Sequence, residues 1–246
     1  LAPLAGKPER VREVIEAVLE MFKRVEKSSE DVSLAKQALI LQSLCYLSLE
    51  QPIEAIDLLE EMEETFLRPE MLLIKAYQMK GDMEKALEYL QGFVYVSLMN
   101  ILGAAPDFFR IYATDQVKME QMFKIYRSLS ELFELEQLHP ASLLQLHLAA
   151  GMVFAEQGEK DKAMDSLEYC VELMYKSNKG NFVLKGNDIF NLLESYLKEV
   201  NVDTLAPRDS VTIWNDFTNL FLTNPAFDPL REEERYKKLI RRLDKE

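Results

Sequence analysis

The sequence is poor in the residue types that perform most metal and nucleophile chemistry. Its 246 residues include only two cysteines, Cys45 and Cys170, and only two histidines, His139 and His147. It contains no CxxC pair, no HExxH stretch, no usable Ser–His–Asp order and no glycine-rich phosphate loop. We therefore predict no catalytic residues, no metal site and no cofactor, and we expect that the protein is not an enzyme.

Long apolar runs and an excess of positive charge are also lacking. The most apolar stretch, residues 93–105, is shorter than the ~20 residues that a membrane-spanning helix needs. A net charge of −13 argues against direct contact with a phosphate backbone. The first residues, LAPLAGKPERV, lack a signal-peptide core and do not begin with Met. We expect a cytoplasmic chain without membrane contact, and we expect another domain before Leu1.

The two cysteines lie in different helical stretches. The composition of their surroundings predicts two buried, reduced side chains that behave as small hydrophobes. A disulfide or a reactive thiol is the alternative, which no neighbouring histidine supports.

What the sequence does contain is a repeated spacing. An aromatic residue is followed after nine residues by an alanine, and the alanine after four more by a leucine. A turn residue lies between the aromatic residue and the alanine. The three sets are Tyr46, Glu50, Ala55 and Leu59; Tyr77, Gly81, Ala86 and Leu90; and Phe154, Gly158, Ala163 and Leu167. The glycine suits a left-handed turn between two helices, and the alanine lets those helices approach closely.

This pattern resembles the tetratricopeptide repeat, with departures. Ile74 stands where the second unit should carry a small residue, Ser43 fills that place in the first, and Glu50 replaces the turn glycine. The resemblance implies an all-α fold, a right-handed α-solenoid of helix pairs. We expect one domain over residues 1–246, made of a lead-in or capping helix (1–30), repeat helix pairs (31–176) and C-terminal capping helices (177–246).

Apolar periodicity and cap residues predict the individual helices. Their expected ranges are 8–27, 32–49, 52–66, 69–80, 82–102, 113–136, two helices within 139–175, 188–199, 210–222 and 229–243. The basic end of the last helix, RYKKLIRR, matches the helix dipole, and a basic contact surface is the alternative. His147 falls where the repeat carries a large packing side chain, so we expect it to pack.

In stacked helix pairs the first helix of each pair lines the concave side. Counting from the repeat alanines, we predict a ligand groove for a protein or short peptide, in which amides bond the peptide backbone and methionines adapt to apolar side chains. The alternative is that these side chains contact only the chain's own helices or a second copy. The predicted groove residues are Gln37, Leu44, Leu47, Met71, Lys75, Gln78, Met79, Gln145, Leu148, Met152 and Glu156.

Four short motifs of the C-terminal half suggest a narrower family. They are LHP at 138–140, LKGND with a following Phe190, APR at 206–208 and NPAF at 224–227. Their order resembles the C-terminal helical-repeat region of bacterial transcriptional regulators that carry an N-terminal helix-turn-helix domain. The resemblance implies a sensor or oligomerisation domain, a homodimer, and DNA contact only through a domain absent from this chain. The residues 93–105 or the last two helices would supply the dimer interface. The competing hypothesis is a stand-alone tetratricopeptide adaptor that scaffolds a protein complex.

Overall fold

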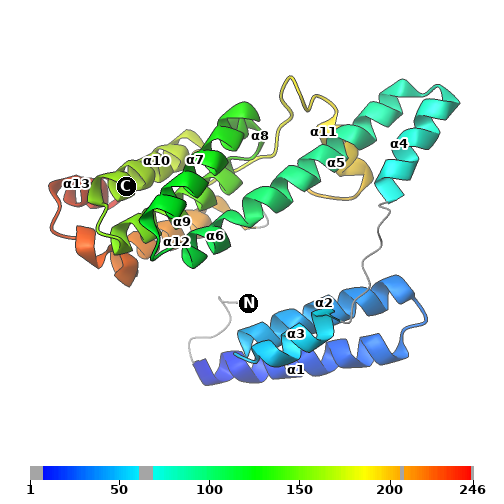
Figure 1. Cartoon of the computed structure of the whole chain (residues 1–246), viewed down its shortest axis with the longest axis horizontal. Coiled ribbons are helices and arrows are strands. Elements are labelled where there is room, and N and C mark those ends of the chain that lie inside the picture. Colours follow the sequence, from blue (N-terminus) through cyan, green and yellow to red (C-terminus); the bar gives the residue numbers. More distant parts are fainter. Residues whose placement is uncertain (1–7, 61–68, 206–207, 245–246) are drawn as a thin grey trace. The chain divides into compact units, whose positions relative to one another are not determined.

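The computed structural model describes residues 8–60, 69–205 and 208–244, and within them every regular element is a helix. Two residues, Val183 and Leu205, form an isolated antiparallel bridge. The elements are α1 (Pro8–Ser28), α2 (Val32–Ser48), α3 (Pro52–Glu60), α4 (Pro69–Lys80), α5 (Met83–Gly103), α6 (Ala105–Ile111), α7 (Gln116–Leu132), α8 (Leu135–Leu138), α9 (Pro140–Glu156), α10 (Lys160–Lys176), α11 (Leu193–Glu199), α12 (Ser210–Thr223), the 3₁₀-helix η2 (Pro225–Leu230) and α13 (Glu234–Asp244) (Figure 1). The predicted all-α class is confirmed.

Backbone contacts divide the chain into two compact units, Leu1–Leu67 and Arg68–Glu246, which we call the N-terminal and C-terminal units. In the N-terminal unit, α2 packs against both α1 and α3. Its buried hydrophobic cluster is small and centres on Ile15, Leu19 and Cys45. Apolar side chains of α2 and α3 remain exposed there, and they include Leu34, Ile40, Leu41, Leu44, Leu47, Ile53 and Ile56.

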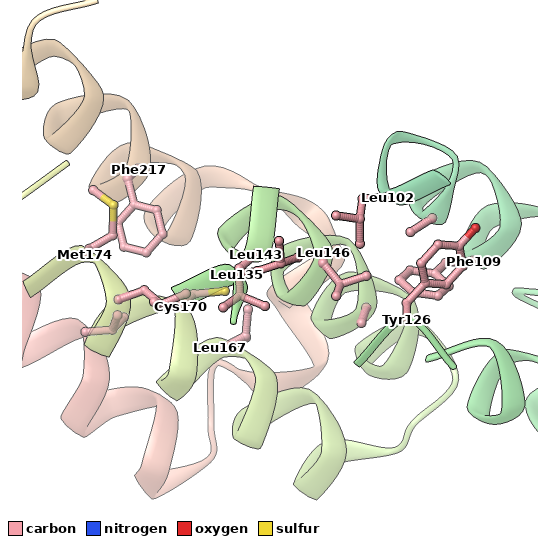
Figure 2. Close-up of a cluster of buried hydrophobic side chains, with 14 of the residues drawn as sticks. Leu102, Phe109, Tyr126, Leu135, Leu143, Leu146, Leu167, Cys170, Met174 and Phe217 are labelled. Carbon is pink, nitrogen blue, oxygen red and sulfur yellow. The ribbon is translucent and has the colours of Figure 1, made fainter. Parts of the chain in front are cut away.

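The C-terminal unit has a much larger core. α9 packs along α10 and also contacts α6 and η2, while α5 packs against α4 and α11. Figure 2 shows part of this core, where Leu135, Leu143 and Leu167 meet from α8, α9 and α10. Gly92 of α5 lies directly against the ring of Tyr196, so that a Cβ atom there would be 2.4 Å from the ring. This glycine therefore allows α11 to approach α5 closely.

The repeated spacing marks the same local structure at each of its three occurrences. The turn residues Glu50, Gly81 and Gly158 all have left-handed backbones, with φ of 59°, 82° and 78°. Ala55, Ala86 and Ala163 are 1%, 2% and 0% exposed, which confirms that these alanines are buried. The leucine position is less uniform. Leu167 is buried, Leu90 is 39% exposed, and the side chain of Leu59 lies outside the described residues.

Helix ends differ from the predictions mainly in the irregular parts of the chain. The helix predicted for 113–136 spans Gln116–Leu132, and α8 follows after a left-handed residue, Glu134. The helix predicted for 188–199 begins only at Leu193. The predicted end of the third helix at 61–66, and residues 206 and 207 of the APR motif, lie outside the described residues.

The apolar stretch around residues 93–105 belongs to a longer one. Among the described residues, one helical segment, Met83–Ile111, is long and apolar enough to cross a membrane by length and composition alone, a test that core helices of water-soluble proteins also pass. Its side chains contribute to the chain's own core at Tyr95, Leu98, Leu102 and Ala105. Val96 and Ile101 remain 38% and 49% exposed.

The basic last helix is a contact surface for the acidic α10. Arg235 of α13 pairs with both Asp165 and Glu168 at 2.7 and 2.8 Å. Arg242 lies 4.5 Å from the centre of the Tyr175 ring, and its backbone carbonyl accepts a hydrogen bond from the hydroxyl of Tyr175. The basic residues thus hold α13 against α10, in addition to any interaction with the helix dipole.

Candidate functional site

A cavity of the C-terminal unit forms a groove between α7 and α10, with α8 at one end and α9 beneath. Its volume is about 1170 Å³. Two ion pairs bridge it. Lys162 of α10 lies 3.0 Å from Glu120 of α7, and Lys176 of α10 contacts Glu136 of α8. Because the N-terminal parts of α7 and α10 lie together at one end, and α8 meets the end of α10 at the other, α7 and α10 run in the same direction.

The residues that line the groove give its length. On α7 they run from Glu120 to Glu131, which are eleven positions apart. At 1.5 Å per residue this corresponds to about 16 Å. The groove is therefore long enough to hold several residues of an extended peptide, at roughly 3.3 Å per residue.

The floor and inner walls of the groove are aromatic. His147 of α9 lies between Phe123 of α7 and Tyr169 of α10, with ring centres 5.5 and 4.4 Å away. Phe154 lies on one side of this group. Its ring centre is 5.4 Å from that of Phe123, and the two rings meet edge-on. Three helices thus each contribute a ring to one cluster.

His147 is the one floor residue with unused hydrogen-bonding capacity. It is 9% exposed, and its Nδ1 atom is buried without a partner. Nε2 has no hydrogen-bond partner in the described part of the chain either, and the residue lines the groove. Burial, helped by the nearby Arg127 guanidinium, lowers the pKa of His147 to about 4. The ring is therefore neutral at pH 7 and adds no charge to the floor.

The rim of the groove is charged, and acidic groups outnumber basic ones. It includes five carboxylates, Glu120, Glu131, Glu134, Glu136 and Asp165, and three cations, Lys124, Arg127 and Lys162.

Most of these rim groups are paired. Arg127 contacts Glu131 at 2.9 Å, whereas Glu134 and Lys124 have no ion-pair partner among the described residues. Tyr169 donates a hydrogen bond to Glu136, and burial together with this bond raises the pKa of the phenol.

The residues predicted to line a ligand groove lie elsewhere. Gln37, Leu44 and Leu47 are exposed on α2, in the N-terminal unit. The four predicted residues of α4, in the C-terminal unit, are also exposed: Met71, Lys75, Gln78 and Met79. Both sets are therefore surface residues. That they line one ligand groove stays a prediction.

The third predicted set is on α9, but it does not line the cavity. Leu148 and Met152 pack against the chain's own core, and Gln145 and Glu156 are exposed. The cavity instead uses Leu143, His147 and Phe154 of the same helix. Sequence reasoning missed α7 as a wall, because α7 belongs to none of the three recognised repeats. The one available signal was His147 itself, an isolated polar side chain within an apolar helix.

Other chemistry-bearing residues do not form a second site. Cys45 and Cys170 are both free thiols and both buried, as predicted. Within residues 8–60, 69–205 and 208–244, no three His, Cys, Asp or Glu side chains are placed to hold a metal ion. Comparisons with protein-family models, curated proteins and solved structures found no match to this chain.

Proposed function

We propose that this chain is a binding module built from tetratricopeptide-like helix pairs, and that its ligand is a peptide segment. The observation that supports this most directly is the groove between α7 and α10, with its length of about 16 Å and its volume of about 1170 Å³. Mixed aromatic and charged linings of this kind suit side-chain recognition along a peptide. The left-handed turns and buried alanines favour the further proposal that the helix pairs stack as a right-handed solenoid.

We further propose that the module is the sensor and oligomerisation region of a bacterial helix-turn-helix regulator that acts in the cytoplasm as a homodimer. The support is the order of the four C-terminal motifs together with the acidic net charge of −13. In such a protein a separate domain contacts DNA. The coding sequence upstream of Leu1 tests this directly, because an adaptor would show no helix-turn-helix pattern there. Light scattering at tens of micromolar protein tests the dimer, and a monomeric mass would count against it.

The peptide-binding function is tested by calorimetric titration with a pool of short peptides of mixed composition. We expect saturable heat from the parent chain. Ser128 lines the groove and is exposed on α7, so Ser128→Trp should block the groove without disturbing the core. Gln121 is exposed on the same helix but does not line the groove, and Gln121→Trp is the matched control.

Two further variants separate the groove from the surface predicted by the repeat pattern. Lys75→Glu and Gln145→Ala alter that surface on α4 and α9. If these two weaken binding and Ser128→Trp does not, the peptide uses the predicted surface. If the parent binds no peptide of the pool, the proposed function is wrong.

A further inference from the structure

The charges along the rim of the groove do not favour a ligand of either sign. Four of the five rim carboxylates are paired with basic side chains, as Lys162–Glu120, Arg127–Glu131, Lys176–Glu136 and Arg235–Asp165. The two rim charges without an ion-pair partner in the described part of the chain, Lys124 and Glu134, have opposite signs. A charged ligand group would therefore meet both signs, so any selectivity of the groove comes from its floor.

The open part of that floor is an aromatic surface. Phe154 is 1% exposed, and the Nζ atom of Lys162 lies 6.0 Å from the centre of its ring, so this end of the floor is covered. Phe123 and Tyr169 are half-buried and line the groove, and their ring centres lie 5.5 and 4.4 Å from that of His147. Aromatic rings prefer edge-on or offset neighbours at about 4.5–7 Å. A further ring that enters between Phe123 and Tyr169 can make contacts of the same kind.

A cation of the chain lies beside this aromatic surface. Arg127 and Glu131 both line the groove and pair at 2.9 Å. Burial is the main cause of the low pKa of His147, the Arg127 guanidinium lowers that pKa further, and the Glu131 carboxylate opposes the shift. Arg127 is exposed on α7, so its side chain can turn onto the face of a bound ring. A guanidinium over an aromatic face is a favourable contact, whereas a bound cation would be repelled by it.

His147 adds a polar group to this otherwise apolar floor. The residue is 9% exposed, its Nδ1 atom is buried, and neither ring nitrogen has a hydrogen-bond partner in the described part of the chain. A buried polar group without a partner costs free energy that a ligand can restore. The neutral imidazole has one N–H donor and one acceptor nitrogen, and a hydroxyl group is both donor and acceptor. A hydroxyl group can therefore pair with either tautomer of His147.

Resting on the proposed peptide-binding function, we propose that the groove selects a tyrosine side chain of the bound peptide. Its ring enters between Phe123 and Tyr169, with the hydroxyl group toward His147 beneath. The Arg127 guanidinium contacts the face of the ring near the rim. A phenylalanine side chain keeps the ring contacts and loses the hydrogen bond, and a leucine side chain keeps only apolar burial.

The test compares three short capped peptides that differ in one central residue, which is tyrosine, phenylalanine or leucine. Calorimetric titration gives the three dissociation constants. We expect the tyrosine peptide to bind about three- to tenfold more tightly than the phenylalanine peptide, which is the value of one neutral hydrogen bond. The phenylalanine peptide should bind several-fold more tightly than the leucine peptide, through its contacts with the rings and the guanidinium. Equal constants for all three would overturn the proposal while leaving peptide binding intact.

One variant tests the hydrogen bond. His147→Phe keeps a ring on the floor and removes both nitrogens, so the tyrosine peptide should lose its advantage over the phenylalanine peptide. The four affinities form a double-mutant cycle that isolates the contact between the hydroxyl group and His147. A preference for tyrosine that persists in His147→Phe would show that the hydroxyl group pairs elsewhere, and it would overturn the proposed site.

A second variant tests the contact at the rim and does not touch the core. Arg127→Gln should weaken the binding of both aromatic peptides several-fold and leave the leucine peptide unchanged. Arg110 is exposed on α6, pairs with Asp107 and does not line the groove, so Arg110→Gln is the control with the same change in net charge. Equal effects of the two variants, or no effect of Arg127→Gln, would mean that the ring does not lie beside Arg127, and the proposed site would be wrong.

The pattern of outcomes separates this inference from the proposed function. If the mixed peptide pool binds and the tyrosine peptide does not, the tyrosine side chain is wrong and the proposed function stands. If neither binds, both fall. Circular dichroism melting of each variant shows whether it keeps the parental fold. If His147→Phe unfolds, Arg127→Gln with its control still decides whether the aromatic side chain uses this site.

Discussion

At the scale of single residues, the buried alanine of the third helix pair has no space around it for a larger side chain. Ala163 is wholly buried in α10, the helix that packs along α9. We expect Ala163→Leu to lower the free energy of unfolding by about 1–3 kcal/mol, because the added methylene and methyl groups force the helices apart. Urea denaturation followed by circular dichroism measures this. Ala76→Leu in the exposed face of α4 is the control and should change stability by less than about 0.5 kcal/mol.

The two histidines make stability depend on pH in a window where few other groups titrate. Burial lowers the pKa of His147 to about 4 and also lowers the pKa of His139, whose Nδ1 accepts the backbone N–H of Ser142 and caps α9. The unfolded chain therefore binds more protons than the folded chain between about pH 4 and 6.5, so stability falls as pH falls through that window. His147 alone accounts for a loss on the order of 3 kcal/mol when the window has been crossed.

The pH effect is measured by urea denaturation between about pH 5 and 7.5, above the range in which most carboxylates titrate. His147→Phe should flatten most of the slope. His139→Asn keeps a cap residue that does not titrate, and should remove only the remaining part. A slope unchanged in His147→Phe would show that His147 is not held in its neutral form by burial.

The residues behind the regulator resemblance have structural tasks in this fold. Asn187 of the LKGND motif donates to the carbonyl of Phe133 and accepts from Ile189 and Phe190, which fixes the turn before α11. Asn224 of the NPAF motif caps η2. These contacts give both asparagines a local structural role, and they do not define a ligand site.

At the scale of elements, the turn of the first helix pair carries a residue that does not suit it. Glu50 has a φ of 59°, whereas glycine occupies the matching left-handed turns at Gly81 and Gly158. We expect Glu50→Gly to stabilise the N-terminal unit by about 0.5–1 kcal/mol, since the relief of strain exceeds the added entropy of the unfolded chain. The converse change, Gly158→Ala, has open space around the new Cβ and should cost about 1 kcal/mol through backbone strain alone. Denaturant midpoints of both variants give the signs, and a destabilising Glu50→Gly would contradict this account.

The helix pairs were largely predictable from the sequence, and the groove was not. Local spacing predicted α4 with α5 and α9 with α10, because a turn, an alanine and an aromatic residue lie within fourteen positions of one another in each pair. The groove depends on contacts such as Glu120 with Lys162, which are far apart in the chain. Nothing in the spacing of α7 indicated that it would run beside α10. Only the folded arrangement shows which face of α9 remains open and which face α6 and η2 cover.

At the scale of the whole molecule, the two units differ greatly in the size of their buried hydrophobic clusters. Each unit contains one cysteine thiol, whose rate of alkylation shows how readily that unit opens. Cys45 belongs to the small cluster with Ile15 and Leu19, and Cys170 is fully buried in the large core of the C-terminal unit. Burial raises the pKa of both thiols, so neither is reactive in the folded state. Labelling requires local or global unfolding.

We therefore expect Cys45 to be alkylated at least about tenfold faster than Cys170 under native conditions, because a small core opens more readily. Mass spectrometry of peptides after timed alkylation measures both rates in one sample. In a Cys45→Ser variant, only the slow alkylation of Cys170 should remain. Equal rates for the two thiols would mean that the units unfold as one.

The close contact of α11 with α5 has a consequence for how the C-terminal unit acquires its structure. The side chain of Gln91 bonds Asn191 and the backbone of Leu192 at 2.8 Å, and Tyr89 donates to Glu199, so residues about a hundred positions apart in the chain must meet. An array of repeats that contact only their neighbours can fold from any point and add units in turn. Here α5 can pack against α4 early, but it lacks its second partner, α11, until the chain beyond residue 190 has been synthesised. Loop closure over that separation makes folding slower than in a purely local helical array, and it makes the unit a single cooperative body and not a series of exchangeable modules.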